Sequence, residues 1–460
     1  MSEWLASALD YIPIWVDYQR ELSDQPGVSL AVAYKGQVLL EHASGMADLA
    51  TRELLTSRHR FRVASHSKTF TAAGIMLLRE RDKIRLDDRL GAYVADLTPE
   101  VADVTISQLL SHAAGLTRDG TDSGQFLDRR PFLSEAEFRA DLSVSQPLEA
   151  GVTFKYSNHG FALLGKIIEK VTGEPYGRWI YDQVVAPAGL TETTPDFDPI
   201  VCRPFARGHS TRYPYGQRFV IPGDNVTNDM ASATGFTASA GDLVRFIGQL
   251  SPAVGSSILK ATSRREMTRR HWRDAHSQLE RYYGLGTISG PPGPWSWVGH
   301  AGGFQGTLTR TVVLPEQDIA ISILTNAIDG LANVWFESVI HILKTIHDLG
   351  APGPATADWR GRWWTLWGPM DLVPGKDKVL VATPGQLSPF FDATELRPTG
   401  IDEAVVAKAQ AFGDLGEACR LIRGAAGTIE GVQIGSKRLV TEDMIKSEVQ
   451  HRYQPSTPVI

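Results

Sequence analysis

The sequence predicts an α+β protein in which an antiparallel sheet is flanked by helices and a helical section, followed by a small all-β unit. Three observations indicate this class. β-prone runs occur near the start and again between residues 282 and 325, helical patterns dominate the residues between them, and short strands separated by turns follow residue 353. Strands far apart in the chain must therefore complete one sheet, and we predict two domains, residues 1–352 and 353–460.

The first predicted elements are a helix, a hairpin and a second helix. The apolar spacing after Ser2 indicates a short amphipathic helix that runs to Pro13, where the missing N–H disfavours continuation. Residues 28–34 and 37–41 are β-prone runs joined by Lys35-Gly36, which predicts a tight hairpin. Residues 65–82 carry more apolar side chains than one helix face needs, so this helix is expected to be buried.

Helices and then strands make up the middle of the chain. Between residues 85 and 250, short helical patterns alternate with loops rich in glycine, proline and aspartate, most clearly at 161–171 and 241–250. Consecutive strand patterns follow and favour antiparallel pairing, at residues 282–289, 295–300, 307–314 and 319–325. A long amphipathic helix is predicted at 331–349.

A change in composition marks the second domain. The segment Gly350-Ala351-Pro352-Gly353-Pro354-Ala355 has the composition of a linker. The β-rich segments beyond it suit a small barrel or a sandwich, and they lie at 363–366, 370–373, 379–382, 394–397, 405–411 and 428–434. We expect its core or an interface to contain four tryptophans, Trp359, Trp363, Trp364 and Trp367.

Composition excludes several classes of function. The 460 residues are 42% hydrophobic and 21% charged with a formal net charge of -6, so a nucleic-acid-binding surface, which normally shows a basic excess, is not expected. No apolar stretch approaches the roughly 18 to 20 residues of a membrane span. Two cysteines, Cys202 and Cys419, are too few for a disulfide framework or a zinc site. The N-terminus lacks the pattern of an export signal, and we expect a soluble, cytoplasmic protein.

The strongest local signal for chemistry is Ser65-His66-Ser67-Lys68 at the start of the buried helix. Side chains three residues apart share a helix face, so the Lys68 amine can take the Ser65 hydroxyl proton once burial or a neighbouring cation lowers its pKa. The spacing alone is weak evidence, because Ser257 and Lys260 repeat it.

Two further segments carry polar groups beside small residues. Tyr156-Ser157-Asn158 allows two interpretations. It is either a structural turn in which Asn158 caps a helix, or a catalytic segment in which the Tyr156 phenol relays protons and the Asn158 amide binds a substrate carbonyl. Residues 297–303 form a predicted strand with interior glycines, which let a ligand or another backbone approach closely. His300 extends from this strand, and the accessible backbone near Gly303 suits an oxyanion hole.

In this order, Ser-x-x-Lys, Tyr-x-Asn and His-x-Gly resemble the three motifs of the serine beta-lactamase and penicillin-binding protein superfamily. The second and third motifs, Tyr-x-Asn and His-x-Gly in place of Lys-Thr-Gly, resemble those of the class C branch. This branch includes D-aminopeptidases, D,D-carboxypeptidases and related esterases. Flanking phrases typical of that branch occupy residues 63–71, 109–116 and 299–303. The resemblance covers about residues 20 to 350 and implies a beta-lactamase-like fold. The C-terminal unit is similar to the small antiparallel, lipocalin-like barrels appended to some members.

The resemblance implies a role for each matched residue. Ser65 would attack the substrate carbonyl, and Lys68 and Tyr156 would share general-base and general-acid duty. Asn158 would orient the substrate amide, and the backbone N–H groups of Ser65 and Gly303 would hold the oxyanion. This chemistry needs no metal and no other cofactor.

His300 occupies the position at which many beta-lactamases carry lysine. A largely neutral imidazole binds a substrate carboxylate less well than a fixed cation, so peptidase, amidase or esterase action is expected rather than efficient antibiotic hydrolysis. The expected activity is D-aminopeptidase-like cleavage of small peptides or amino acid amides through an acyl-enzyme. A carboxylesterase, a transacylase and a penicillin-binding sensor without turnover are the alternatives, and self-association is left open. Loops 118–131 and 209–228 are expected to set specificity.

Overall fold

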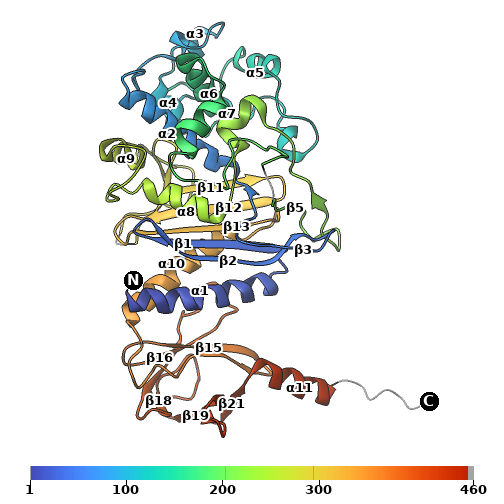
Figure 1. The fold of residues 1–460 in the computed structure, drawn as a ribbon, viewed down its shortest axis with the longest axis vertical. Coiled ribbons are helices and arrows are strands. Elements are labelled where there is room, and N and C mark those ends of the chain that lie inside the picture. The colour runs from blue at the N-terminus through green and yellow to red at the C-terminus, as the bar shows by residue number, and fades with distance from the viewer. Residues whose placement is uncertain (1, 202–203, 294, 454–460) are drawn as a thin grey trace, which may run out of the picture. The chain divides into compact units, whose positions relative to one another are not determined.

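The structure is a computed structural model that describes residues 2–201, 204–293 and 295–453 (Figure 1). The chain divides into two compact units, a larger one from Asp24 to Phe336 and a smaller one that combines the residues up to Ser23 with those from Glu337 onward. This division lies earlier in the chain than the boundary predicted between residues 352 and 353, because most of helix α10 (Ala332–Leu349) belongs to the smaller unit.

The larger unit is built on an antiparallel sheet. Among the described residues nine strands form it, in the order β3-β2-β1-β13-β12-β11-β10-β9-β8. The early hairpin therefore joins the late strands, with β1 paired to β13 from Val28–Thr325 to Tyr34–Ile319. The predicted hairpin and antiparallel pairing are confirmed. The strands are β1 (Gly27–Tyr34), β2 (Gln37–Asp48), β3 (Glu53–Leu54), β8 (Trp272–Arg273), β9 (Tyr282–Tyr283), β10 (Ile288–Ser289), β11 (Val298–Phe304), β12 (Thr307–Leu314) and β13 (Ile319–Thr325).

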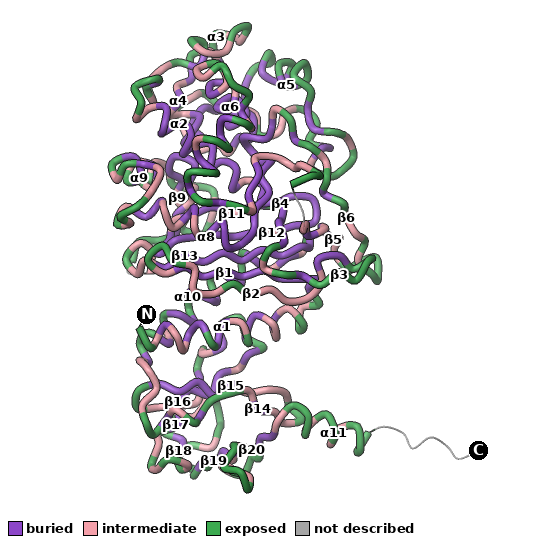
Figure 2. Tube along the Cα trace, viewed as in Figure 1, coloured by how far each residue is buried: buried purple, intermediate pink, exposed green. Residues whose placement is uncertain are grey.

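Helices cover the sheet and continue as a helical section. Helix α8 (Ala240–Gln249) packs on β1, β12 and β13, and its Phe246 ring stacks 3.9 Å from the ring of Phe70 in α2 (Ser67–Glu80). Helix α2 is buried from Ser67 to Leu78, as predicted (Figure 2). The other helices of this unit are α3 (Pro99–Ala102), α4 (Ile106–Leu110), α5 (Glu135–Leu142), α6 (Asn158–Thr172), α7 (Tyr176–Ile180) and α9 (Ala261–Thr268). Two short strand pairs complete it, β4 (Phe61–Arg62) with β7 (Thr237–Ala238) and β5 (Gly208–His209) with β6 (Val220–Ile221).

The smaller unit contains a closed antiparallel barrel in which each strand pairs with the next. Of the two predicted alternatives, a barrel and a sandwich, the barrel is therefore confirmed. Its described strands are β14 (Gly361–Thr365), β15 (Gly368–Pro374), β16 (Val379–Ala382), β17 (Thr394–Pro398), β18 (Glu403–Lys408), β19 (Ala418–Arg423), β20 (Ile429–Ile434) and β21 (Lys437–Val440), followed by helix α11 (Glu442–Tyr453). Trp359, Trp363 and Cys419 lie in the barrel core. Trp367, in contrast, is 96% exposed at the β14–β15 turn. Cys202 lies outside the described residues.

The N-terminal helix is longer than predicted. Helix α1 (Glu3–Leu22) continues through Pro13, because Trp15 and Val16 beyond the proline are fully buried and their packing offsets the lost hydrogen bond. Ser2 occupies the N-cap position, but its side chain makes no capping bond. Among the helices of the described residues, none is both long enough and apolar enough to cross a membrane.

Candidate active site

The turn that carries Ser65 is strained and is held by side chains on both sides. Ser65 lies in a 3-10 turn (Ala64–His66) that leads directly into α2. Ala64 has a φ of 46°, a left-handed conformation that residues with a Cβ atom rarely adopt. Ser67 Oγ donates to the Ala64 carbonyl at 2.5 Å, and His66 Nδ1 lies 2.9 Å from the Val63 carbonyl oxygen. The half-buried Ser65 side chain is thereby presented at the start of a buried helix.

Two of the predicted partners lie within hydrogen-bond distance of Ser65. Lys68 Nζ is 3.0 Å from Ser65 Oγ, as their spacing on one helix face predicts. Tyr156 Oη donates to the same oxygen at 2.8 Å. The Ser65 hydroxyl therefore lies between an amine that can take its proton and a phenol that can supply one.

Lys68 contacts three acceptors inside the protein. Besides Ser65 Oγ, its buried Nζ contacts Asn158 Oδ1 at 2.6 Å and the Ala233 carbonyl oxygen at 2.8 Å. Amide and backbone carbonyl oxygens only accept hydrogen bonds, so two amine hydrogens stay with these two partners when Lys68 loses its proton. The lone pair of the neutral amine must then face Ser65 Oγ. The network thus orients Lys68 as a base for Ser65.

Asn158 is itself oriented by a carboxylate. Its Nδ2 donates to Asp119 Oδ1 at 2.5 Å, and because an ionised carboxylate only accepts, this contact turns Oδ1 of Asn158 toward Lys68. Ser157 rather than Asn158 caps helix α6, since Ser157 Oγ accepts the Gly160 N–H at 2.9 Å. One Nδ2 hydrogen and one Oδ1 lone pair of Asn158 remain for a substrate, and that contact stays a prediction.

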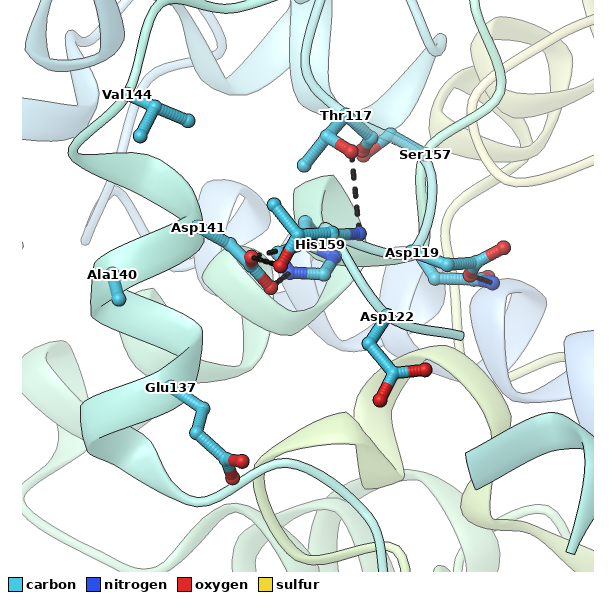
Figure 3. A network of polar contacts seen from close by, with 12 residues as sticks. Thr117, Asp119, Asp122, Glu137, Ala140, Asp141, Val144, Ser157 and His159 are labelled. Carbon is cyan, nitrogen blue, oxygen red and sulfur yellow. Dashed lines mark hydrogen bonds and ion pairs between the residues drawn. The ribbon is translucent and has the colours of Figure 1, made fainter. Parts of the chain in front are cut away.

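Hydrogen bonds around the buried side chains of Asp141 and His159 anchor the loop that carries Asp119 (Figure 3). Asp141 of α5 pairs with His159, whose Nε2 lies 3.1 Å from Asp141 Oδ2. The other carboxylate oxygen accepts from both the N–H and the hydroxyl of Thr121, each at 3.1 Å. On the N-terminal side of Asp119, the Thr117 carbonyl oxygen accepts a hydrogen bond from the Ser157 hydroxyl at 2.6 Å. The loop is therefore fixed on both sides of Asp119.

Burial moves the pKa values of the two Ser65 partners in opposite directions. Desolvation lowers the pKa of the Lys68 amine well below its usual value; the Asp119 carboxylate opposes this shift, and the Arg118 guanidinium adds to it. The same burial raises the pKa of the Tyr156 phenol above its usual value. Lys68 is thus suited to be the base, and Tyr156 keeps its proton and is suited to be the donor.

Strand β11 runs against the Ser65 turn because Gly302 has no side chain. A Cβ atom at Gly302 would lie 2.1 Å from the Val63 carbonyl oxygen, closer than these atoms can approach. Gly303 follows and is exposed, and its backbone N–H is the predicted second donor to the oxyanion. That role stays a prediction, and the contact of strand and turn places the segment against the residues next to Ser65.

His300 is buried, and protein groups contact both of its ring nitrogens. Its Nε2 is 3.1 Å from the Tyr283 hydroxyl, its Nδ1 is 2.7 Å from the Ala301 carbonyl oxygen, and 1% of the residue is exposed. Burial lowers the pKa of the His300 imidazole well below its usual value, and the charges of His66 and Lys68 add to the shift. The imidazole is therefore neutral near neutral pH, as expected, and its contact with substrate stays a prediction.

Sequence reasoning missed three groups of the site. The Ala233 carbonyl carries no sequence signal, because any residue supplies a backbone oxygen. Tyr283 lies in a strand, where an aromatic residue is common for packing reasons alone. Asp119 falls within the loop 118–131 that was expected to set specificity, but only the fold brings it to Asn158.

The two loops that were expected to set specificity meet at one residue. Gln305 follows β11, and its side-chain amide donates to the Gln125 carbonyl in loop 118–131 at 2.5 Å. Its Oε1 accepts from Asn225 of loop 209–228 at 3.1 Å. The residue that follows the strand beside the Ser65 turn therefore joins both loops.

A serine in contact with a lysine and a tyrosine, presented at a helix start beside an antiparallel strand, defines a serine hydrolase site. A family model described as Beta-lactamase matches residues 16–333. The chain belongs to the beta-lactamase family, and the predicted fold and enzyme class are confirmed. The matched range contains every predicted site residue and ends before the barrel.

Curated relatives match parts of the chain. Penicillin-binding protein 4 of Amycolatopsis lactamdurans is 29% identical over 337 residues, which cover 69% of this chain and 84% of that protein. Protein flp of Staphylococcus aureus (strain MW2) is 26% identical over 183 residues, which cover 39% of this chain. The match spans 36% of the length of Protein flp.

Solved structures share the fold over longer stretches. SurE is 21% identical with a TM-score of 0.63, covering 95% of this chain and 99% of that one. The octameric penicillin-binding protein homologue from Pyrococcus abyssi is 20% identical with a TM-score of 0.64, covering 94% and 99%. D-amino acid amidase from Ochrobactrum anthropi SV3, complexed with L-phenylalanine, is 24% identical with a TM-score of 0.61, covering 74% and 99%. These similarities show the fold, and the first two extend into the barrel unit.

Proposed function

We propose that the protein is a serine amidase or aminopeptidase that acts through an acyl-enzyme on D-amino acid amides or on the N-terminal residue of short peptides. One observation carries the proposal: Lys68 and Tyr156 both contact Ser65 Oγ, at 3.0 and 2.8 Å. Such an arrangement supplies a nucleophile, a base and a proton donor at one atom.

The proposed reaction moves one proton at each step. The Lys68 amine takes the Ser65 proton while Oγ attacks the substrate carbonyl, and the backbone N–H groups of Ser65 and Gly303 hold the oxyanion. Tyr156 gives its proton to the leaving amine. The Lys68 ammonium, which contacts the same Ser65 Oγ as the Tyr156 hydroxyl, then restores that proton. Water attacks the acyl ester and gives a proton to the same pair, which returns one to Ser65.

The charges around the site support a substrate with a free amino group. The Asp119 carboxylate reaches Asn158, and 16% of its side chain is exposed. The adjacent cation, Arg118, forms an ion pair with Asp119, with 3.0 Å between Nε and Oδ2, and His300 is neutral. Neither residue is therefore a strong anchor for a substrate carboxylate. The preference for D-residues is proposed from the similarity to D-amino acid amidase.

The test is a substrate panel run with the wild-type protein and with Ser65→Ala. It contains amides and p-nitroanilides of D- and L-amino acids, their N-acetyl forms, short peptides, p-nitrophenyl esters and a beta-lactam. The proposal predicts that D-amino acid amides with a free amino group turn over at least about tenfold faster than the L-forms and the acetylated forms. Turnover of esters alone would indicate a carboxylesterase. Product that forms only when an amine or alcohol is added would indicate a transacylase. A stable adduct without turnover would indicate a sensor.

We also propose that the chain self-associates. The support is its similarity in fold to the octameric homologue from Pyrococcus abyssi. Light scattering over a range of protein concentrations measures the mass directly, and a monomer at every concentration would reject the proposal.

A further inference from the structure

His112 is a buried residue next to the Ser65 network that the proposed reaction does not use. It follows helix α4 and lies in the phrase at residues 109–116 that is typical of the family branch. We propose that His112 is a positioning residue that holds the Tyr156 hydroxyl on Ser65. The inference rests on the proposed acyl-enzyme function, in which Tyr156 supplies the proton to the leaving group.

His112 holds the backbone on both sides of Tyr156. Its carbonyl oxygen accepts the Lys155 N–H at 2.7 Å. Its Nδ1 accepts the Ser157 N–H at 3.1 Å. Tyr156 therefore lies between two backbone hydrogen bonds to the same histidine, which fixes the direction in which its side chain leaves the chain.

The His112 ring also packs on the Tyr156 side chain. The two ring centroids are 4.1 Å apart, and the planes are inclined by 37°. On its other sides the imidazole contacts Tyr283 at 4.6 Å and Phe161 at 5.0 Å between centroids. These contacts restrict the phenol ring to the orientation in which its hydroxyl is 2.8 Å from Ser65 Oγ.

The hydrogen bond from the Ser157 N–H to His112 Nδ1 requires a neutral imidazole with its proton on Nε2. Nδ1 can accept the Ser157 N–H only when it is unprotonated. His112 Nε2 is buried and has no hydrogen-bond partner among the described residues. Burial lowers the pKa of His112 well below its usual value, and the charge of Lys68 adds to that shift. The residue is therefore built as an acceptor and not as a second acid.

The backbone of His112 offers a conservative replacement. Its φ is 58°, in the left-handed region where asparagine is the best tolerated residue after glycine. Asparagine also places an acceptor oxygen close to the position of Nδ1. His112→Asn should therefore keep the hydrogen bond to Ser157, whereas His112→Leu removes the acceptor and keeps apolar bulk.

The experiment compares leaving groups in the full-length protein. For a D-amino acid amide, His112→Leu should lower kcat by about 10- to 100-fold, because a displaced donor loses part of the 10²- to 10⁴-fold that general-acid catalysis contributes. For a p-nitrophenyl ester, whose leaving group needs no proton, the loss should be less than about threefold. His112→Asn keeps the hydrogen bond to Ser157 but lacks the ring that packs on Tyr156, so it should lose less than His112→Leu on the amide and less than about threefold on the ester.

A double mutant separates positioning from a general structural role. In a Tyr156→Phe background, His112→Leu should cause no further loss of amide turnover, because the group that it positions is already absent. His59→Leu is the matched control: His59 is buried, and its Nδ1 accepts the Thr56 N–H at 3.0 Å. It should lower the thermal midpoint and leave the kcat of the folded protein unchanged.

Three results would overturn the role of His112. They are equal losses on amide and ester, a further loss in the Tyr156→Phe background, and equal damage from His112→Asn and His112→Leu. If His112→Leu does not fold, His112→Gln replaces it, since its acceptor extends one bond farther than that of asparagine. A wild-type protein that is never acylated at Ser65 would instead defeat the proposed function, so the two failures are distinguishable.

Discussion

Asn158 Oδ1 lies 2.6 Å from Lys68 Nζ, and Nδ2 of the same amide lies 2.5 Å from Asp119 Oδ1. The carboxylate thereby fixes the amide, and the amide fixes the amine that faces Ser65. A single neutral side chain separates the base from the anion, which keeps Lys68 oriented without giving it a direct ion pair that would favour its charged form.

Asn158→Asp should shift the pH dependence of the reaction. A carboxylate beside Lys68 stabilises the ammonium and raises the pKa of Lys68, so the acidic limb of kcat/KM should move to higher pH by about one unit or more. Asn158→Ala removes the contact without adding charge and serves as the control. The profile is measured with an uncharged ester, and an unchanged limb in Asn158→Asp would show that Lys68 is not the base.

Asp119→Asn should change KM for a substrate with a free amino group more than KM for an uncharged substrate. The variant keeps an acceptor for Asn158 but removes the charge that raises the pKa of Lys68, so the acidic limb should move to lower pH. If Asp119 also binds the substrate ammonium, KM for a D-amino acid amide should rise by about tenfold or more while KM for an uncharged ester is unchanged. Equal effects on both substrates would contradict this role.

Gly302→Ala should abolish efficient acylation. The added Cβ would lie 2.1 Å from the Val63 carbonyl oxygen and would push β11 away from the Ser65 turn. We expect acylation to slow by about 100-fold or more, the effect of losing one oxyanion donor. Gly303→Ala is the comparison, because its Cβ would meet only Leu308 Cδ2, at 3.2 Å, and should cost much less. Stopped-flow acylation by an activated ester measures both.

His66 should make stability depend on pH. Burial lowers the pKa of its imidazole from 6.5 to about 4 in the folded protein. Between these values the unfolded chain binds a proton that the folded chain does not, so the free energy of unfolding falls as the pH is lowered through this window. His66→Gln should therefore lose less stability than wild type between about pH 7 and about pH 5. Urea titrations monitored by circular dichroism at each pH test this, and parallel losses in the two proteins would refute it.

A chain that ends at Gly353 should still be acylated at Ser65, since the predicted site residues lie between residues 65 and 303. Its thermal stability should be lower. Helix α1 loses the hydrogen bond from Gln19 to Pro384 at 2.6 Å, and α10 loses that from Lys376 N–H to Leu349 at 3.1 Å. A folded, monodisperse truncation that no small activated ester can acylate would show that the barrel supplies part of the site.

The motifs located the nucleophile, but spacing alone could not choose it. Ser257 and Lys260 have the spacing of Ser65 and Lys68, yet they lie in an irregular segment before α9, whereas Ser65 lies in a 3-10 turn that leads directly into α2. Ser257 Oγ instead accepts the Leu259 N–H at 3.2 Å. A separation of three residues brings side chains together when the backbone that links them is helical, as it is from the 3-10 turn of Ser65 into α2. The tertiary contact from Tyr156, 91 residues away, is what distinguishes the two pairs.

The remaining differences have local causes. Helix α1 passes Pro13 because burial beyond the proline outweighs one lost hydrogen bond. Strand β19 was not predicted because the alternation that buries Cys419 and Leu421 spans only a few residues and ends where the register shifts between Ile422 and the exposed Arg423. Asp119 joins the site only through loops that the fold brings together, and no periodic pattern predicts such contacts.

The most direct test of the account is the mass and position of the covalent intermediate. The protein is mixed with a D-amino acid p-nitroanilide and with an activated ester, quenched in acid during turnover, and examined by intact-mass and peptide mass spectrometry. We predict one acyl group per chain, on the peptide that contains Ser65, and no adduct in Ser65→Ala. Turnover by Ser65→Ala at the wild-type rate, or an adduct that maps to Ser257, would contradict the assignment of Ser65 as the nucleophile.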